Sequence, residues 1–170
     1  RLLEEAKEAA ENASREKTAI LNKVMESIHY AQTIQQAILT TEAQLRQLVP
    51  ESFVIWQPKD VISGDMIWSR AHGDGFAIAV IDCTGHGVPG GVMTMAAVSC
   101  LDRVVSEIGV NNPGKVLQRV SRVVQAMLSG QEADGFSEDG LDMGFLLYRR
   151  TEGRLYYAGS RLSLFSCRNG

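Results

Sequence analysis

Residues 76–90, FAIAVIDCTGHGVPG, form an unbroken apolar run that ends in a glycine-rich turn. An apolar run of this length is typical of a strand covered on both faces. Asp82 ends the run, and the glycines that follow permit backbone conformations closed to other residues, so they can turn carbonyl and amide groups toward a ligand. The stretch therefore predicts a buried strand, a tight turn and the start of a helix.

A second short motif, ISGD at residues 62–65, lies just upstream and is joined to the first through a hairpin signal, HGDG at residues 72–75. An aspartate at the end of an apolar strand has left the core, so its carboxylate must meet water, a partner or a metal. Carboxylate and backbone carbonyl oxygens suit magnesium or manganese rather than zinc. The start of the following helix favours an anion such as phosphate. From these residues alone, a turn merely shaped by glycines remains an open alternative.

The remainder of the chain after residue 49 alternates strand and helix patterns. Strands are expected at residues 53–56, 66–69, 76–81, 142–149, 154–158 and 162–167, helices at 92–108 and 113–128, and a polar loop at 129–140. Strands, then two helices, then strands again indicate an α+β domain. We expect residues 49–170 to form this domain, with an antiparallel β-sandwich flanked by helices.

Residues 1–48 are expected to form a separate linker dominated by one long helix. The first 40 residues contain no glycine or proline, and their apolar residues recur at spacings of three and four, as in a coiled coil or a two-helix hairpin. A helix of that length extends roughly 60 Å, longer than a small domain is wide. We therefore expect a homodimerising helix that carries signals from an upstream sensory region, with a simple packing linker as the alternative. Because the chain begins at Arg1, we expect it to be part of a longer protein.

Composition excludes several classes of protein. The chain has 17 Lys and Arg against 20 Asp and Glu, a formal charge of -3, which argues against a nucleic-acid binder. Its 3 cysteines are widely spaced and no secretory leader is visible, which favours a reducing compartment over a disulfide framework. No apolar run approaches the roughly 18 residues that cross a bilayer. The expected location is the cytoplasm, alone or as the cytoplasmic part of a membrane-anchored regulator.

The pairing of ISGD with DCTGHGVPG resembles the SpoIIE-like, RsbU-like branch of the bacterial metal-dependent protein phosphatases. That branch typically shows G-G-D or S-G-D, then D-x-x-G-H-G, followed by Pro-Gly and a helix. Residues 30–39 (YAQTIQQAIL) resemble its linker helix, and residues 139–143 (DGLDM) and 157–159 (YAG) resemble its later segments. The resemblance covers nearly the whole chain in the right order.

This resemblance implies a protein serine/threonine phosphatase with a binuclear magnesium or manganese centre. Asp82 would bridge the two ions, the backbone carbonyl of Cys83 would bind one of them, and Asp65 would bind directly or through water. Water would attack a phosphoserine or phosphothreonine without a covalent enzyme intermediate. The implied substrate is a small anti-sigma-antagonist protein with a STAS-like fold, which changes partner when it is dephosphorylated.

The chain departs from the family at its end, because the later T-D-G and D-D or D-N motifs that complete the metal centre are absent. We expect the domain to be incomplete at its C-terminus, with loss of catalysis as the alternative. In that case the chain would be a non-catalytic regulatory or dimerisation module that binds the phosphoprotein without turnover. A glycine-rich nucleotide-binding domain is a weaker hypothesis, because the sequence contains neither the G-x-G-x-x-G motif nor the P-loop lysine motif of such domains.

Five further residues have side chains that could take part in catalysis or binding. His86 and Lys59 are candidates to contact phosphate, although His86 is at least as well explained by bracing its turn. The Cys83 thiol is not expected to act as a nucleophile, because no third group orients the Cys–His pair. Asp139 and Asp142 are expected to cap turns rather than to bind metal.

Overall fold

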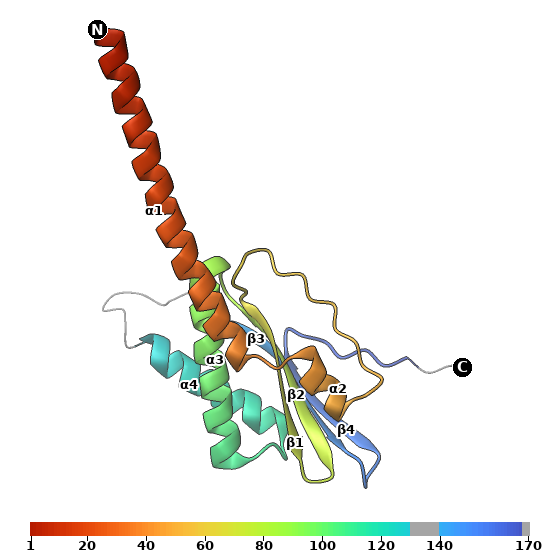
Figure 1. Cartoon of the computed structure of the whole chain (residues 1–170). Coiled ribbons are helices and arrows are strands. Elements are labelled where there is room, and N and C mark those ends of the chain that lie inside the picture. The colour runs from red at the N-terminus through yellow and green to blue at the C-terminus, as the bar shows by residue number, and fades with distance from the viewer. Residues whose placement is uncertain (130–139, 168–170) are drawn as a thin grey trace.

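A four-stranded antiparallel sheet in the order β1-β2-β3-β4 forms the centre of the computed structural model, which describes residues 1–129 and 140–167 (Figure 1). The strands are β1 (Asp65–His72), β2 (Gly75–Cys83), β3 (Leu141–Arg149) and β4 (Arg154–Ser160). The predicted hairpin between β1 and β2 is confirmed, and Gly73 takes the left-handed conformation there with φ of 56°. Glycine adopts that conformation without steric cost.

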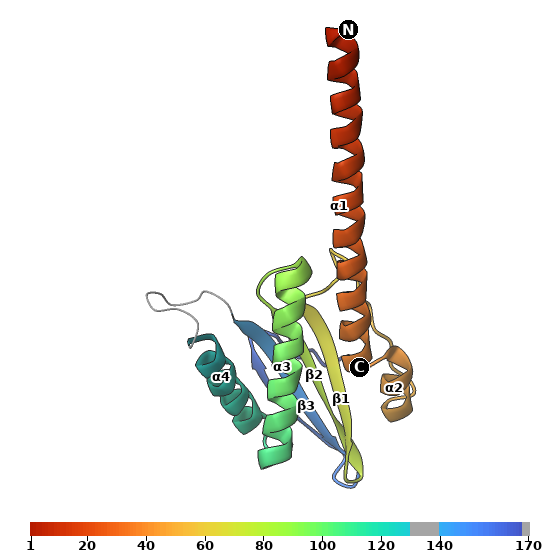
Figure 2. The ribbon, with the colours of Figure 1, turned by 60° about the vertical axis from the view of Figure 1, so that its left-hand side comes forward.

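Two helices, α3 (Gly87–Ile108) and α4 (Pro113–Ser129), cover one face of the sheet (Figure 2). Every second side chain along the strands enters the core between the sheet and these helices. Among them, Ile81, Phe145 and Leu147 are fully buried. The helix α3 is also long and apolar enough to cross a membrane. However, half of its most apolar 18-residue stretch is buried inside the domain. Its burial against the sheet explains its apolar character without a membrane.

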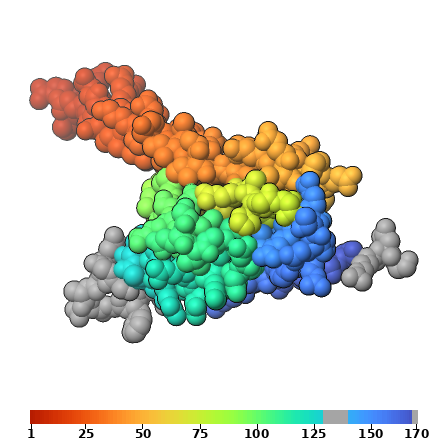
Figure 3. All heavy atoms as spheres, turned by 90° about the horizontal axis from the view of Figure 1, so that it is seen from below, coloured from red at the N-terminus to blue at the C-terminus, as the bar shows by residue number. Residues whose placement is uncertain are grey.

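The long helix is confirmed as α1 (Leu2–Ile38), and it runs out from the domain (Figure 3). Only its last turns pack on the domain, and Gln35 is its one fully buried residue. Upstream, apolar side chains such as Ile20 and Val24 are about half exposed, at 56% and 49%. A short second helix, α2 (Glu42–Leu48), follows, and its start is fixed by a capping box between Thr41 and Gln44.

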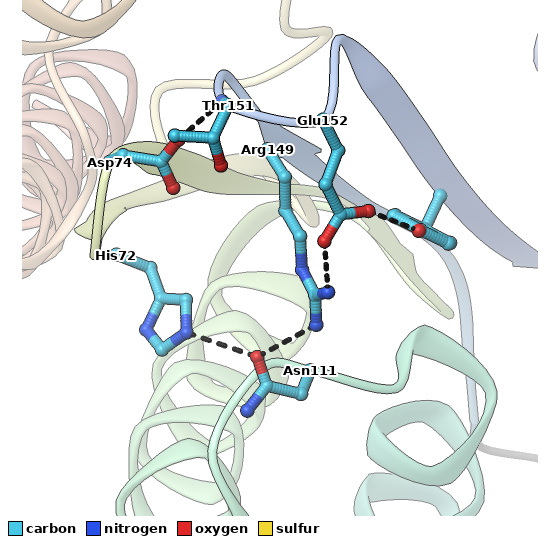
Figure 4. Close-up of polar contacts among 7 residues, drawn as sticks. His72, Asp74, Asn111, Arg149, Thr151 and Glu152 are labelled. Carbon is cyan, nitrogen blue, oxygen red and sulfur yellow. Dashed lines mark hydrogen bonds and ion pairs between the residues drawn. The ribbon is translucent and has the colours of Figure 1, made fainter.

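Polar side chains join the three turns at the far end of the sheet from Asp82 (Figure 4). Asn111, between α3 and α4, accepts a hydrogen bond from Arg149 and contacts the His72 ring, each at 3.2 Å. Asp74 in the first hairpin accepts a hydrogen bond from the backbone N–H of Thr151 in the second. This end of the domain is thus held by contacts that do not involve the candidate site.

Several details differ from the sequence-based expectations. Residues 53–56 and 162–167 are not strands: Phe53 and Ile55 are exposed, and after β4 the chain turns away at Arg161 with φ of 58°. A strand needs a neighbour for its backbone groups, and neither segment pairs with the sheet. The expected β2 strand is covered on one face only, since Val80 is 48% exposed.

The antiparallel sheet and its flanking helices are confirmed, while the second sheet of the expected sandwich is not among the described residues. Most of the expected loop at residues 129–140, including Asp139, also lies outside them. The division of the chain after residue 48 stays a prediction.

Candidate active site

Three aspartates form a row across one end of the sheet. Asp65 at the start of β1 pairs in register with Asp82 near the end of β2, and Asp82 pairs with Asp142 near the start of β3. Each neighbours a buried residue of the helix-covered face, such as Met66 or Met143, so alternation places the aspartates on the opposite face. The row thus lies on the uncovered side of the sheet.

The carboxyl groups of this row disturb one another. Partial burial raises the pKa of Asp82, and the charge of Asp65, a hydrogen bond with the Asp65 carboxyl and the charge of Asp142 raise it further. Neighbouring carboxylates resist simultaneous ionisation because like charges repel at short range. A divalent cation would relieve that repulsion.

Close backbone contact at Gly64 brings the two motifs together. A Cβ built on Gly64 would lie 2.8 Å from the carbonyl oxygen of Gly85 and 2.9 Å from that of Cys83. The backbone N–H of Cys83 also donates to the carbonyl oxygen of Gly64 at 3.1 Å. Glycine is therefore required at residue 64 for sterics, and the Cys83 carbonyl lies against the segment that leads into Asp65.

Side chains from two helices fix the preceding residue, Ser63. The buried Gln35 of α1 donates from Nε2 to the Ser63 carbonyl at 2.7 Å and accepts from the Ser63 N–H at 3.2 Å. The buried Thr94 hydroxyl of α3 lies 3.0 Å from the Ser63 carbonyl and 2.9 Å from that of Gly64. The Ser63 hydroxyl in turn accepts from the N–H of Asp65 at 3.0 Å. The position of Asp65 thus depends on how α1 docks.

Replacing Gln35 with methionine is expected to lower stability by about 1–3 kcal/mol, because the Ser63 amide and carbonyl lose buried partners. It should also weaken manganese binding, since Asp65 follows Ser63 closely. Thermal unfolding with and without manganese measures both effects. The adjacent exposed residue offers a matched control, Gln36→Met. Equal melting temperatures and equal manganese responses for the two variants would contradict the role given to Gln35.

The two residues predicted to contact phosphate, His86 and Lys59, lie outside the strands of the sheet. His86 stands at the N-cap of α3, and its Nδ1 lies 2.7 Å from Oδ2 of Asp60. The histidine side chain is 67% exposed, so the ring can be reached from solvent. Lys59 is an exposed neighbour of Asp60. No motif or spacing in the sequence predicts the contact between Asp60 and His86.

The Cys83 side chain is buried on the helix side of the sheet, at 3% exposure. Burial raises the pKa of its thiol to about 11, although a hydrogen bond with Thr94 opposes the shift. The thiol therefore stays protonated near neutral pH, and a protonated thiol is a poor nucleophile. The structure agrees with the expectation that the Cys83 thiol does not act as a nucleophile.

Alkylation by iodoacetamide near neutral pH is expected to label the exposed Cys167 and to spare the buried Cys83. Cys100 is also buried, and burial raises its pKa. Peptide mass spectrometry of the folded protein measures the labelling at each position, with denatured protein as the control. Rapid labelling of Cys83 in the folded protein would show that its thiol is accessible and ionised.

The expectation that Asp142 caps a turn is wrong, because Asp142 lies inside β3 opposite Asp82. Hydrogen bonds between Thr84, just after β2, and Gly140, just before β3, support the pairing of these strand ends. The Thr84 N–H donates to the Gly140 carbonyl at 3.0 Å, and the Thr84 hydroxyl accepts from the Gly140 N–H at 2.8 Å. Like Asp82, Asp142 is a carboxylate at the end of a strand with apolar residues, and this pattern could have identified it as a candidate site residue.

The residues of the row fit a hard divalent cation in part. Asp65 and Asp82 supply adjoining carboxylates, and their mutual repulsion favours a bound cation. Among residues 1–129 and 140–167, however, no group of three acidic, histidine or cysteine side chains converges closely enough to hold a metal ion. The described part of the chain therefore provides a partial ligand set.

Comparisons with known proteins agree with this geometry. Residues 72–160, more than half of the chain, match the family described as Stage II sporulation protein E (SpoIIE). The chain belongs to the SpoIIE family. Nine chains of solved structures match it, whereas no curated protein sequence does.

One of these solved structures is the SiaA-PP2C domain of Pseudomonas aeruginosa, which is 35% identical to this SpoIIE-family chain with a TM-score of 0.74. The match covers 84% of this chain but 56% of the SiaA chain. The predicted resemblance to the SpoIIE branch is confirmed, and the match to the SiaA phosphatase module agrees with it. The fold of this chain is therefore similar to that of a PP2C domain.

Proposed function

We propose that the chain is the catalytic part of a metal-dependent protein serine/threonine phosphatase. The observation that carries this proposal is the pairing of Asp65 and Asp82 in register, with the pKa of Asp82 raised by partial burial and by the neighbouring carboxylates. Accessible carboxylates whose pKa is shifted by a specific charged partner are candidates for functional groups. Membership of the SpoIIE family supports the reaction class.

Asp65 and Asp82 would hold magnesium or manganese, with the backbone carbonyl of Cys83 as a further oxygen donor beside them. Bound cations of this kind would supply charge neutralisation and an activated water for attack on phosphorus. Gly64 keeps the two motifs at contact distance, and Gln35 and Thr94 hold the loop that aims Asp65. Because these contacts hold the aspartates in place before the substrate binds, they lower the entropic cost of reaching the transition state.

The proposed substrate is a phosphoserine or phosphothreonine of a small STAS-like regulatory protein, as family resemblance suggests. We also propose that two copies pair through α1, because its apolar side chains are exposed along a stripe that the domain does not cover. A coiled coil would bury such a stripe.

Pairing through α1 predicts a dimer mass by light scattering for the intact chain, and a monomer mass for a double variant, Ile20→Glu with Val24→Glu. Both residues are about half exposed in the single chain, so the charges are expected to disturb association rather than the fold. A monomeric intact chain would contradict the proposed dimer.

Hydrolysis of p-nitrophenyl phosphate with manganese, with magnesium and with EDTA tests the phosphatase proposal. The assay uses the longest natural polypeptide that contains the chain, with the 170-residue chain in parallel. Metal-dependent turnover that EDTA removes is the expected result. A folded protein that binds a phosphorylated STAS-like domain without turnover would instead support the non-catalytic module.

A further inference from the structure

We propose that Arg161 binds the phosphoryl group of the substrate, at the end of the sheet where the row of aspartates lies. This inference rests on the proposed phosphatase function and gives that site a residue that recognises its substrate. Its starting point is the backbone of Arg161, which follows β4 directly and has a φ of 58°. Within residues 1–129 and 140–167, every other residue with a positive φ is a glycine. Such conformations are costly and gather at functional sites.

The register of the strands places Arg161 beside the row. Met143 of β3 pairs with Ser160, the last residue of β4. One step further toward this end of the sheet stand Asp142 on one chain segment and Arg161 on the other, so the arginine adjoins the third aspartate of the row. The end of the sheet thus carries three carboxylates followed by one guanidinium group.

A tyrosine holds the bend after β4 on the face of the sheet that carries the row. The Tyr157 hydroxyl donates to the Leu162 carbonyl at 2.6 Å. Gly144 and Gly159, which pair with one another, leave room for this contact. A Cβ on Gly144 would lie 2.6 Å from the Tyr157 hydroxyl oxygen, and a Cβ on Gly159 would overlap the Leu162 carbonyl oxygen. Because Gly144 lies two residues after the third aspartate of the row, alternation puts both on the uncovered face, and the bend folds onto that face.

The guanidinium group of Arg161 is available to a ligand. The residue is exposed, and in the part of the chain that the structure describes its side chain makes no hydrogen bond or ion pair. By contrast, Arg70, Arg103 and Arg149 each bind a carboxylate of the protein. Arginine presents its donors in a planar fork that can bind two phosphate oxygens at once. When bound cations balance the charge of the aspartates, an anionic phosphoryl group next to them would be held by this fork.

The variant Arg161→Asn removes the cation and keeps the bend, because asparagine adopts a positive φ more readily than arginine does. We expect it to weaken the binding of inorganic phosphate to the manganese-loaded protein about tenfold, as loss of hydrogen bonds to a charged group does. KM for p-nitrophenyl phosphate should rise as well. The melting temperature should equal or exceed that of the unaltered protein. Arg161→Lys should keep part of the phosphate affinity, since it retains the charge without the fork.

Isothermal titration calorimetry of inorganic phosphate into the manganese-loaded protein measures this affinity without turnover. The protein is the longest natural polypeptide that contains the chain, as in the hydrolysis assay. Arg150→Asn is the matched control, because Arg150 is an exposed arginine just after β3, at the opposite end of the sheet. It should bind phosphate as the unaltered protein does.

A phosphate affinity in Arg161→Asn equal to that in Arg150→Asn would overturn the inference, while turnover by the unaltered protein would leave the phosphatase proposal standing. Manganese affinity, measured on the same variants, separates the two sites. A loss of manganese binding in Arg161→Asn would also overturn the inference, because the arginine would then act on the metal site rather than on phosphate. If the unaltered protein neither binds phosphate nor hydrolyses p-nitrophenyl phosphate with manganese, both proposals fail.

Discussion

The variant Asp82→Asn is expected to lose manganese-dependent hydrolysis of p-nitrophenyl phosphate by at least about 100-fold, because even residues that only support metal ligands cost 10–100-fold. Without metal, the same variant should melt at the same temperature as the unaltered protein or higher. The pKa of Asp82 is raised in the folded state, so its ionised form costs stability. That cost appears as the pH rises from the ordinary value of 3.8, and it is fully present above the raised folded pKa.

Calorimetry at neutral pH with and without manganese tests the thermal part of this prediction. Manganese should raise the melting temperature of the unaltered protein, because a ligand that binds the folded state stabilises it. The variant should show little of that rise. Full activity in Asp82→Asn, or a normal manganese response, would remove Asp82 from the site.

The variant Gly64→Ala is expected to cost about 2–3 kcal/mol in unfolding free energy and most of the activity. The added Cβ would lie under 3.0 Å from two backbone carbonyl oxygens, those of Gly85 and Cys83. Backbone atoms cannot move aside as the end of a flexible side chain can. The two motifs must therefore separate, and Asp65 moves away from Asp82.

A matched glycine is available in α4 for comparison. A Cβ on Gly114 would meet only the Asn112 side chain at 3.5 Å, an ordinary contact, so Gly114→Ala should be neutral or up to about 1 kcal/mol stabilising. Urea unfolding of the two variants gives both free energies. Similar stability and activity for Gly64→Ala and the unaltered protein would contradict the close packing of the motifs.

The pairing of Asp65 with Asp82 could be derived from the sequence. A two-residue turn at Gly73 and Asp74 sets His72 opposite Gly75, and counting back along both strands brings the two aspartates opposite one another. The apolar run that ends at Asp82 indicated which end of the strand leaves the core. Local turn chemistry was sufficient here because the two strands are adjacent in the chain.

The pairing of Asp142 with Asp82 could not be derived by counting residues back from a turn. Two helices, α3 and α4, separate β2 from β3 in the chain, so no short turn fixes the register of the two strands. The same limit applies to Gln35, which has no local feature that distinguishes it from Gln36, and to the contact between Asp60 and His86. These residues are selected by tertiary packing, which periodicity does not report.

Equilibrium binding of manganese, followed by the electron paramagnetic resonance of the free ion, is the most direct test of the central claim. We expect the unaltered protein to bind manganese, and Asp65→Asn and Asp82→Asn each to weaken the binding, whereas Asp74→Asn should not. Manganese binding of equal strength in all four proteins would show that the row of aspartates does not hold the metal.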